Sequence, residues 1–272
     1  MGMADSIFAL AAITLILALV GGLIPLFGKM KGEPSQLKMT TGIAAGILLA
    51  SALMVIIPEG FEIASHGKEL EPLFLGGAIL AGFLMMLILE GSGIGHAVHE
   101  EHHDHTEEHG HGHVHHQTSP WMLVLGLTLH SAADGLAIGA AAASQIKAVT
   151  AIVVFAVLVH KVPAAFSLGV FSLHERNNRN SAIRDVVLFS LATPVMIIIS
   201  FYTLGGLNEE MIGLAMLFAA GTFLYVATVD TLPDIHNPET GKKALLHVII
   251  GATILTLIFF GADAVGWLSH SH

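Results

Sequence analysis

The chain has 272 residues, of which 54% are hydrophobic and 12% charged, and its mean hydropathy is +0.75. This composition excludes an ordinary soluble domain and is typical of a protein that crosses a bilayer several times. The formal net charge of -10 comes with no basic cluster of the kind that binds nucleic acid. The chain has no cysteine, so a bound metal must be held by nitrogen and oxygen atoms.

Apolar runs of about 20 residues, enough to cross about 30 Å of hydrocarbon, fit about eight times along the chain. The first follows "MGMADS", which has no basic region, so we expect a retained span and not a signal peptide. The predicted spans are roughly residues 6–27, 40–60, 72–93, 120–143, 148–172, 186–206, 211–229 and 244–267.

Basic residues are distributed unevenly between the loops. The loops on one side carry only Lys68 and Lys147. The loops after the odd-numbered spans carry Lys29, Lys31, Lys38, Arg176, Arg179, Arg184, Lys242 and Lys243. By the positive-inside rule, this bias places both termini outside the cytoplasm. Because the chain has no long insertions, we expect the plasma (cell) membrane and not an internal one.

One low-complexity segment separates the third and fourth spans. We predict that residues 94–119 form a disordered cytoplasmic loop, because "HAVHEEHHDHTEEHGHGHVHHQ" has ten histidines, five acids and no apolar periodicity. Imidazoles in such a loop can bind transition metals loosely, although a merely soluble linker is the alternative. The histidines expected to bind are His102, His103, His105, His109, His111, His113, His115 and His116.

Two pairs of segments echo each other. "VIIPEG" at 55–60 and "VDTLPDI" at 229–235 each run from apolar residues to a proline and an acid. "HSAADGLAIG" at 130–139 aligns with "HKVPAAFSLG" at 160–169. Such echoes indicate repeated transporter halves around a central helix pair. We therefore predict an all-α multi-pass membrane protein, a single domain over residues 1–272, with eight transmembrane helices in a 3+2+3 inverted-repeat arrangement.

The fourth and fifth spans carry the candidate metal ligands. His130 and Asp134 are four residues apart and so project from one helix face. An imidazole and a carboxylate at this spacing suit zinc or a neighbouring divalent metal. His160 aligns with His130 and is the expected third ligand. A buried His–Asp hydrogen bond between helices is the structural alternative, but ionisable groups inside a membrane are usually functional.

Four further residues are candidates for the transport pathway: Lys161, Ser131, Asp230 and Glu59. Lys161 needs a counter-charge near mid-membrane, for which Asp134 is the nearest candidate, and it could take the place of a second metal. A lysine that snorkels to the interface is the alternative. Asp230 could accept a departing ion and Glu59 could gather cations at the entrance, although either could be an ordinary interfacial acid.

"HSAADG" in the fourth span, "HKVPAA" in the fifth, "LYVATVDTLPD" in the seventh and the histidine-rich loop together resemble the ZIP (Zrt/Irt-like) metal transporters. Within that family, the HK-P-A pattern in the fifth span is most similar to that of the group that contains the ninth human ZIP. The resemblance implies a 3+2+3 helical fold, a homodimer, and movement of zinc, sometimes iron or manganese, toward the cytoplasm. It also implies that His130, Asp134 and His160 are primary ligands and that Asp230 belongs to the release route.

The chain departs from the pattern of many family members at three positions. Ser131 replaces an asparagine, Lys161 replaces an asparagine or glutamate, and Ala164 replaces a metal-binding residue. These changes remove ligands for a second metal, so we expect a mononuclear site. The divalent ion, with zinc expected first and iron, manganese or cadmium as alternatives, is then a transported substrate and not a cofactor, and alternating access is the expected mechanism.

Three other functions remain as alternatives at the level of sequence. A cation-diffusion efflux carrier also combines HxxxD with a His-rich loop, but it usually has six spans and a cytoplasmic C-terminal domain. An intramembrane metalloprotease would need HExxH, which is absent, so we expect no enzyme. A membrane metal sensor or receptor could use the same fold without net flux.

Overall fold

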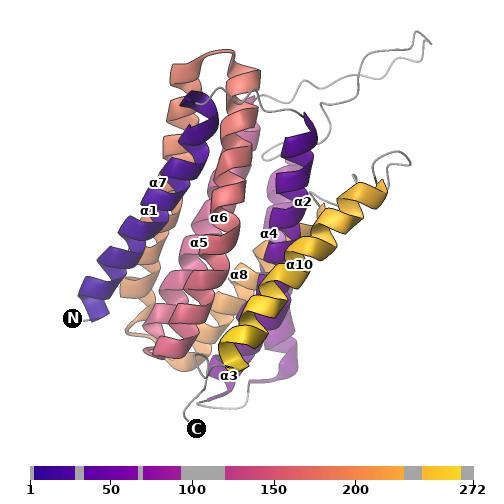
Figure 1. Cartoon of the computed structure of the whole chain (residues 1–272). Coiled ribbons are helices and arrows are strands. Elements are labelled where there is room, and N and C mark those ends of the chain that lie inside the picture. The colour runs from indigo at the N-terminus through magenta and orange to yellow at the C-terminus, as the bar shows by residue number, and fades with distance from the viewer. Residues whose placement is uncertain (1–2, 28–33, 67–69, 93–119, 230–240, 265–272) are drawn as a thin grey trace.

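The computed structural model describes residues 3–27, 34–66, 70–92, 120–229 and 241–264. Within these ranges the chain is helical apart from short turns (Figure 1). The elements are α1 (Met3–Phe27), α2 (Pro34–Ser51), the π-helical η1 (Ala52–Ile56), α3 (Ile57–Ser65), α4 (Pro72–Gly91), α5 (Pro120–Ala143), α6 (Lys147–Arg176), α7 (Arg179–Leu204), α8 (Glu209–Val229) and α10 (Gly241–Ala264). The histidine-rich segment 94–119 with its eight named histidines, and Asp230, lie outside the described residues.

Eight helices are long and apolar enough to cross a membrane, which confirms the predicted all-α multi-pass fold. Three spans are longer than predicted by five residues or more. The second runs over Lys38–Ser65, through α2, η1 and α3, the fifth runs over Lys147–Arg176, and the sixth runs over Arg179–Leu204. Hydropathy detects only the part of a helix that lies in hydrocarbon, whereas backbone hydrogen bonding continues into the polar boundary.

The turn between α6 and α7 is set by two asparagines. Asn177 ends α6 in the left-handed region, with a φ of 45°, which asparagine tolerates better than most residues. Asn178 then caps α7, because its side-chain oxygen accepts hydrogen bonds from the backbone N–H groups of Asn180 and Ser181 at 2.9 and 3.3 Å. This sharp reversal brings α7 back along α6.

The helices pack in two groups. In the first group, α1 packs on α6 and α7, and α5 packs on α7 and α6. In the second group, α2 packs on α10, and both α3 and α4 pack on α8. The groups lie side by side in Figure 1 and meet where α5 contacts α8 and α2 contacts α6. The beginning of α1 and the end of α10 lie at the same end of the bundle.

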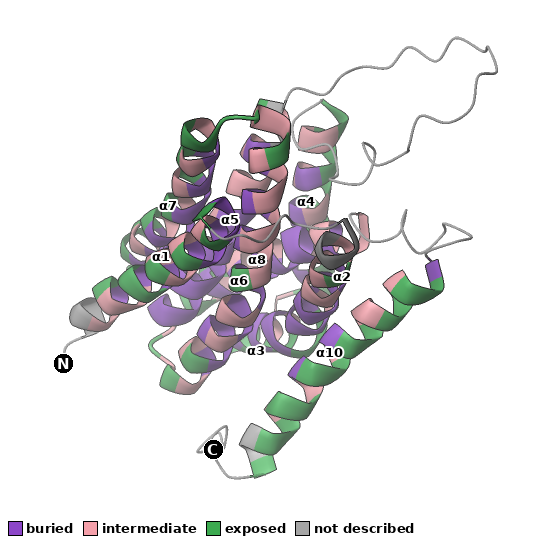
Figure 2. Cartoon of the chain, turned by 45° about the horizontal axis from the view of Figure 1, so that its top comes forward, coloured by how far each residue is buried: buried purple, intermediate pink, exposed green. Residues whose placement is uncertain are grey.

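Burial follows this arrangement. Helices α5 and α8 form the centre, and α4 and α10 expose most of their apolar surface on the outside (Figure 2). The run of small residues in α5 permits its close packing on α7: a side-chain carbon at Gly135 would collide with Thr193, and one at Gly139 with Ser200. The exposed apolar faces are suited to contact with lipid chains.

Candidate metal centre

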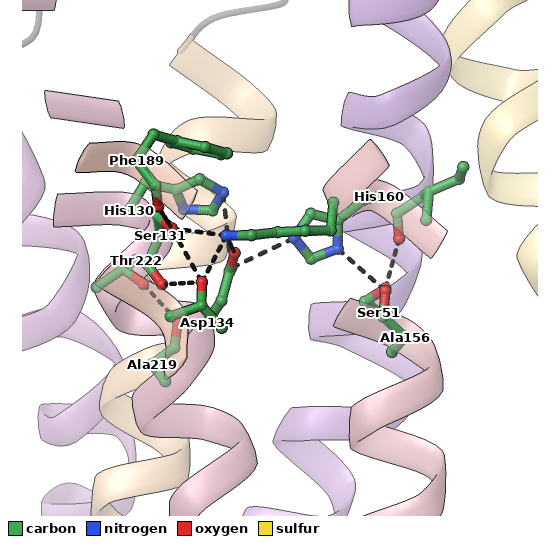
Figure 3. Close-up of polar contacts among 12 residues, drawn as sticks. Ser51, His130, Ser131, Asp134, Ala156, His160, Phe189, Ala219 and Thr222 are labelled. Atoms are coloured by element: carbon green, nitrogen blue, oxygen red, sulfur yellow. Dashed lines mark hydrogen bonds and ion pairs between the residues drawn. The ribbon is translucent and has the colours of Figure 1, made fainter. Parts of the chain in front are cut away.

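The candidate ligands come from the two adjacent helices α5 and α6. His130 and Asp134 lie one turn apart on α5, and His160 lies on α6 (Figure 3). Their exposed fractions are 3%, 1% and 1%, so all three side chains are enclosed by the bundle. In the part of the chain that the structure describes, they form the one group of three or more such residues able to hold a metal ion.

The three ligand atoms converge on one point. One nitrogen from each histidine and one Asp134 carboxylate oxygen all lie within 4.8 Å of one another. Asp134 Oδ1 lies 3.3 Å from His160 Nε2 and 3.8 Å from His130 Nε2. In a tetrahedral zinc site with bonds of about 2.0–2.2 Å, neighbouring ligand atoms are about 3.4 Å apart. The observed spacing therefore suits a single divalent ion.

The hydrogen bond on the far side of His160 orients its ring. Nδ1 lies 3.0 Å from the carbonyl oxygen of Ala156, which can only accept, so Nδ1 carries the proton. A neutral His160 ring then directs the lone pair of Nε2 at a carboxylate oxygen of Asp134. A cation between the two atoms removes their repulsion, and a backbone carbonyl on the other ring nitrogen is the usual support of a metal-binding histidine.

His130 is held mainly by packing. Its Nδ1 is one of two buried side-chain polar atoms without a hydrogen-bond partner in the described part of the chain. The ring of Phe223, on α8, meets the rings of both His130 and His160 edge to face, with centroid distances of 5.6 Å in each case. His130 therefore presents Nε2 toward Asp134 without a hydrogen bond to it, while Phe223 limits how both rings can rotate.

Lys161 fills the other side of Asp134. Its Nζ donates to Asp134 Oδ2 at 2.8 Å, so the carboxylate faces the histidines with one oxygen and the ammonium with the other. Nζ also donates to Ser131 Oγ at 2.6 Å and to Thr193 Oγ1 at 2.5 Å. The ammonium lies 4.4 Å from the centre of the Phe189 ring. We call Ser131, Asp134 Oδ2 and Thr193 the lysine cage.

The structure thus brings together five of the predicted ligand and pathway residues on α5 and α6: His130, Ser131, Asp134, His160 and Lys161. Glu59 lies elsewhere, buried on α3 well before that helix ends, and is not part of the three-residue group. Sequence reasoning missed Thr193 and Phe223. Thr193 directly precedes Pro194 inside an apolar span, a local signal that could have drawn attention to it. Phe223 has no comparable signal.

Helices that span a membrane around a buried His–Asp–His group define a multi-pass membrane protein with an intramembrane cation site. A family model described as ZIP Zinc transporter matches residues 91–259. Zinc transporter ZIP9 of Xenopus tropicalis is 33% identical over 92% of this chain and 94% of its own length. Zinc transporter ZIP9 of Micropogonias undulatus is 35% identical over the same shares. Zinc transporter ZIP2 of Homo sapiens is 31% identical over 56% of this chain and 51% of its own.

The chain therefore belongs to the ZIP zinc transporter family. The matches to ZIP9 proteins along nearly the whole chain confirm the predicted placement in that group. Family membership separates the protein from the cation-diffusion carriers and makes it an integral multi-pass membrane protein. Its relatives carry names of transporters and not of enzymes.

Proposed function

We propose that the protein carries zinc across the membrane into the cytoplasm, with His130, Asp134 and His160 as the ligands of one ion. The observation that carries this proposal is the convergence of three buried ligand atoms in a chain of the ZIP family. Zinc is the metal in the names of the relatives, and the set of two nitrogens and one oxygen also suits iron, manganese or cadmium.

The mononuclear character rests on Lys161. Its ammonium occupies the oxygen-lined space beside Asp134 that a second cation would need. Before an ion binds, the charge of Asp134 is balanced by Lys161, and the two histidines are neutral as ligands. A divalent ion therefore adds two positive charges to a site with no net charge, which favours reversible binding over tight retention.

The reciprocal contacts of four glycines support the proposed 3+2+3 inverted repeat. Gly46 of α2 lies against the backbone of α10, and Gly251 of α10 lies against the backbone of α2. Gly82 of α4 and Gly221 of α8 make the same kind of mutual contact. If spans one to three are related by an inverted repeat to spans six to eight, span two corresponds to span seven and span three to span eight. The contact of α2 with α10 then corresponds to the contact of α8 with α4. Repeats of this kind commonly move by alternating access, presenting the ion first outward and then inward.

The same proposal covers the orientation of the protein, the membrane in which it lies and its oligomeric state. The excess of basic residues in the odd-numbered loops favours termini outside the cytoplasm, in the plasma membrane. The family likeness favours a homodimer. Glu59 and Asp230 are proposed as acids of the entrance and release routes, and the eight loop histidines as a cytoplasmic metal buffer.

Uptake by the purified protein in liposomes tests the function. We expect zinc to accumulate inside the vesicles, and competition by iron, manganese and cadmium ranks the substrates. His130→Ala and His160→Ala should each abolish uptake while the protein stays folded. His247→Ala, which makes the same change on α10 away from the site, should leave it intact. Zinc binding without accumulation would favour the non-transporting sensor, and full flux in His130→Ala would remove the proposed site.

A further inference from the structure

A second polar site lies at the end of the bundle where α5 begins, α6 ends and α7 begins. A shallow cavity of about 380 Å³, largely open to the outside, lies there and is lined by Trp121, Arg176, Arg184 and Leu188. Its lining combines two guanidinium groups with an aromatic ring and an aliphatic side chain. None of these residues takes part in the metal centre.

One of the two arginines is fixed in place by a buried acid. Asp185 is fully buried and accepts from Arg176 Nε at 2.9 Å and from Arg176 Nη2 at 3.3 Å. Ser172 donates to the same carboxylate at 2.6 Å. Arg176 is therefore held in one orientation at the wall of the cavity, which lowers the entropy lost when a ligand binds.

The other arginine is only loosely engaged. Arg184 is 60% exposed, and its Nη2 lies 3.8 Å from Asp185 Oδ1, beyond hydrogen-bonding distance. Asp185 carries one negative charge against two positive charges, so the site keeps an excess charge of one. That excess belongs to an exposed guanidinium, whose planar donors match the oxygens of a phosphate.

The position of Arg184 relative to the membrane indicates which kind of phosphate-bearing molecule can reach this site. On α7, Arg184 begins a line of outward-facing residues that continues as Leu188, Leu191, Val195, Ile199 and Tyr202. From Arg184 to Tyr202 the helix rises by about 27 Å at 1.5 Å per residue, close to the hydrocarbon thickness of about 30 Å. Arg184 therefore lies at one boundary, at the level of lipid headgroups, and the exposed ring of Trp121 is suited to the same level.

We infer that this cavity binds the phosphate of an anionic phospholipid headgroup between Arg184 and Arg176, with the acyl chains along Leu188 and the apolar face of α7. A basic pocket between membrane helices at headgroup level is the arrangement that recognises such lipids. The site is separate from the metal ligands, so it binds lipid whether or not zinc is present.

Native mass spectrometry of the metal-free protein tests the site. With phosphatidylglycerol and phosphatidylcholine of matched chains, we expect the protein to retain the anionic lipid. Arg184→Gln should lower the ratio of anionic to neutral lipid about tenfold, the value of one charge-assisted hydrogen bond. Arg179→Gln is the matched control, since Arg179 is a nearby arginine that stacks on Phe27, 5.4 Å from its centre, and does not line the cavity. It should leave the ratio unchanged.

Two further measurements distinguish a lipid phosphate from free phosphate, and a specific site from general attraction by charge. Trp121→Ala keeps every charge and removes one wall, and it should also weaken retention of the anionic lipid. Excess inorganic phosphate should not displace the lipid. Displacement by phosphate would show a site for a soluble anion, and equal losses in Arg184→Gln and Arg179→Gln would show attraction by general charge. Either result overturns the inference, and neither bears on zinc uptake.

Discussion

Asp134 contacts both the histidines and Lys161, and a double-mutant cycle with Lys161 separates its role as a zinc ligand from its role in the buried ion pair. The Asp134 carboxylate gives Oδ1 to the histidines and Oδ2 to the Lys161 ammonium. Both side chains are almost completely buried, with exposed fractions of 1% and 0%. The variants are Asp134→Asn, Lys161→Met and the combination of both, compared with the native protein after removal of metal.

The burial of the Asp134–Lys161 ion pair determines the expected changes in folding free energy. Removal of one partner of a buried ion pair leaves an uncompensated charge and costs about 3–5 kcal/mol of folding free energy. Replacement of both partners by neutral groups of similar volume is often nearly neutral. Each single variant should therefore lose several kcal/mol, the double variant should lose less than either, and the coupling energy should reach about 3 kcal/mol.

Zinc binding should follow a different pattern from stability. Asp134→Asn and the double variant both replace the anionic carboxylate by a neutral amide, a much weaker zinc ligand, and should lose zinc binding. Lys161→Met keeps the ligand and removes an ammonium that repels a divalent ion held by the same carboxylate. For a single and a double positive charge about 5 Å apart at an effective dielectric constant of about 20, Coulomb's law gives a repulsion of about 7 kcal/mol. This variant should bind zinc more tightly than the native protein and should gain more stability when zinc is added.

Denaturant unfolding in detergent micelles gives the stabilities, and titration calorimetry gives the affinities. If the destabilisation of the double variant equals the sum of the two single losses, Asp134 and Lys161 are not a coupled pair. If the double variant binds zinc as the native protein does, Asp134 is not a ligand. Either outcome would refute the division of roles between the two carboxylate oxygens.

Three other outcomes can be checked with the same preparations. Uptake should be slower at pH 5.5 than at pH 7.5 without a pH gradient, because protons compete with zinc for the histidine nitrogens, and a flat profile would argue against imidazole ligands. Gly139→Ala should destabilise the fold by about 1–3 kcal/mol through collision with Ser200, whereas Gly76→Ala, in open space, should not; equal thermal stability would disprove tight α5–α7 packing. Phe223→Leu should raise the KM for zinc by freeing both histidine rings, and unchanged kinetics would leave Phe223 a packing residue.

The sequence predicted those features whose cause is local. The spans follow from runs of apolar residues, and the shared face of His130 and Asp134 follows from helical periodicity. The pairing of Asp134 with Lys161 could also be expected, because a buried ammonium requires a counter-charge and few acids lie at that depth.

The features that escaped prediction depend on contacts between distant helices. A threonine hydroxyl in an apolar span can satisfy itself on its own helix backbone, so nothing local shows that Thr193 reaches across to Ser131 and Lys161. Phe223 is one of many phenylalanines in the chain, and only the packing of α8 against α5 places it between two histidines.

The placement of every candidate ligand in one helix group affects the energy barrier along the transport route. Gly135 and Gly139 fix α5 closely to α7, so a movement of α5 and α6 alone would have to break that contact. A movement of α1, α5, α6 and α7 together would instead carry the ion with its complete set of protein ligands past Phe223 of α8. The ion would then lose its water shell once on entering and regain it once on leaving, with no exchange of ligands at mid-membrane.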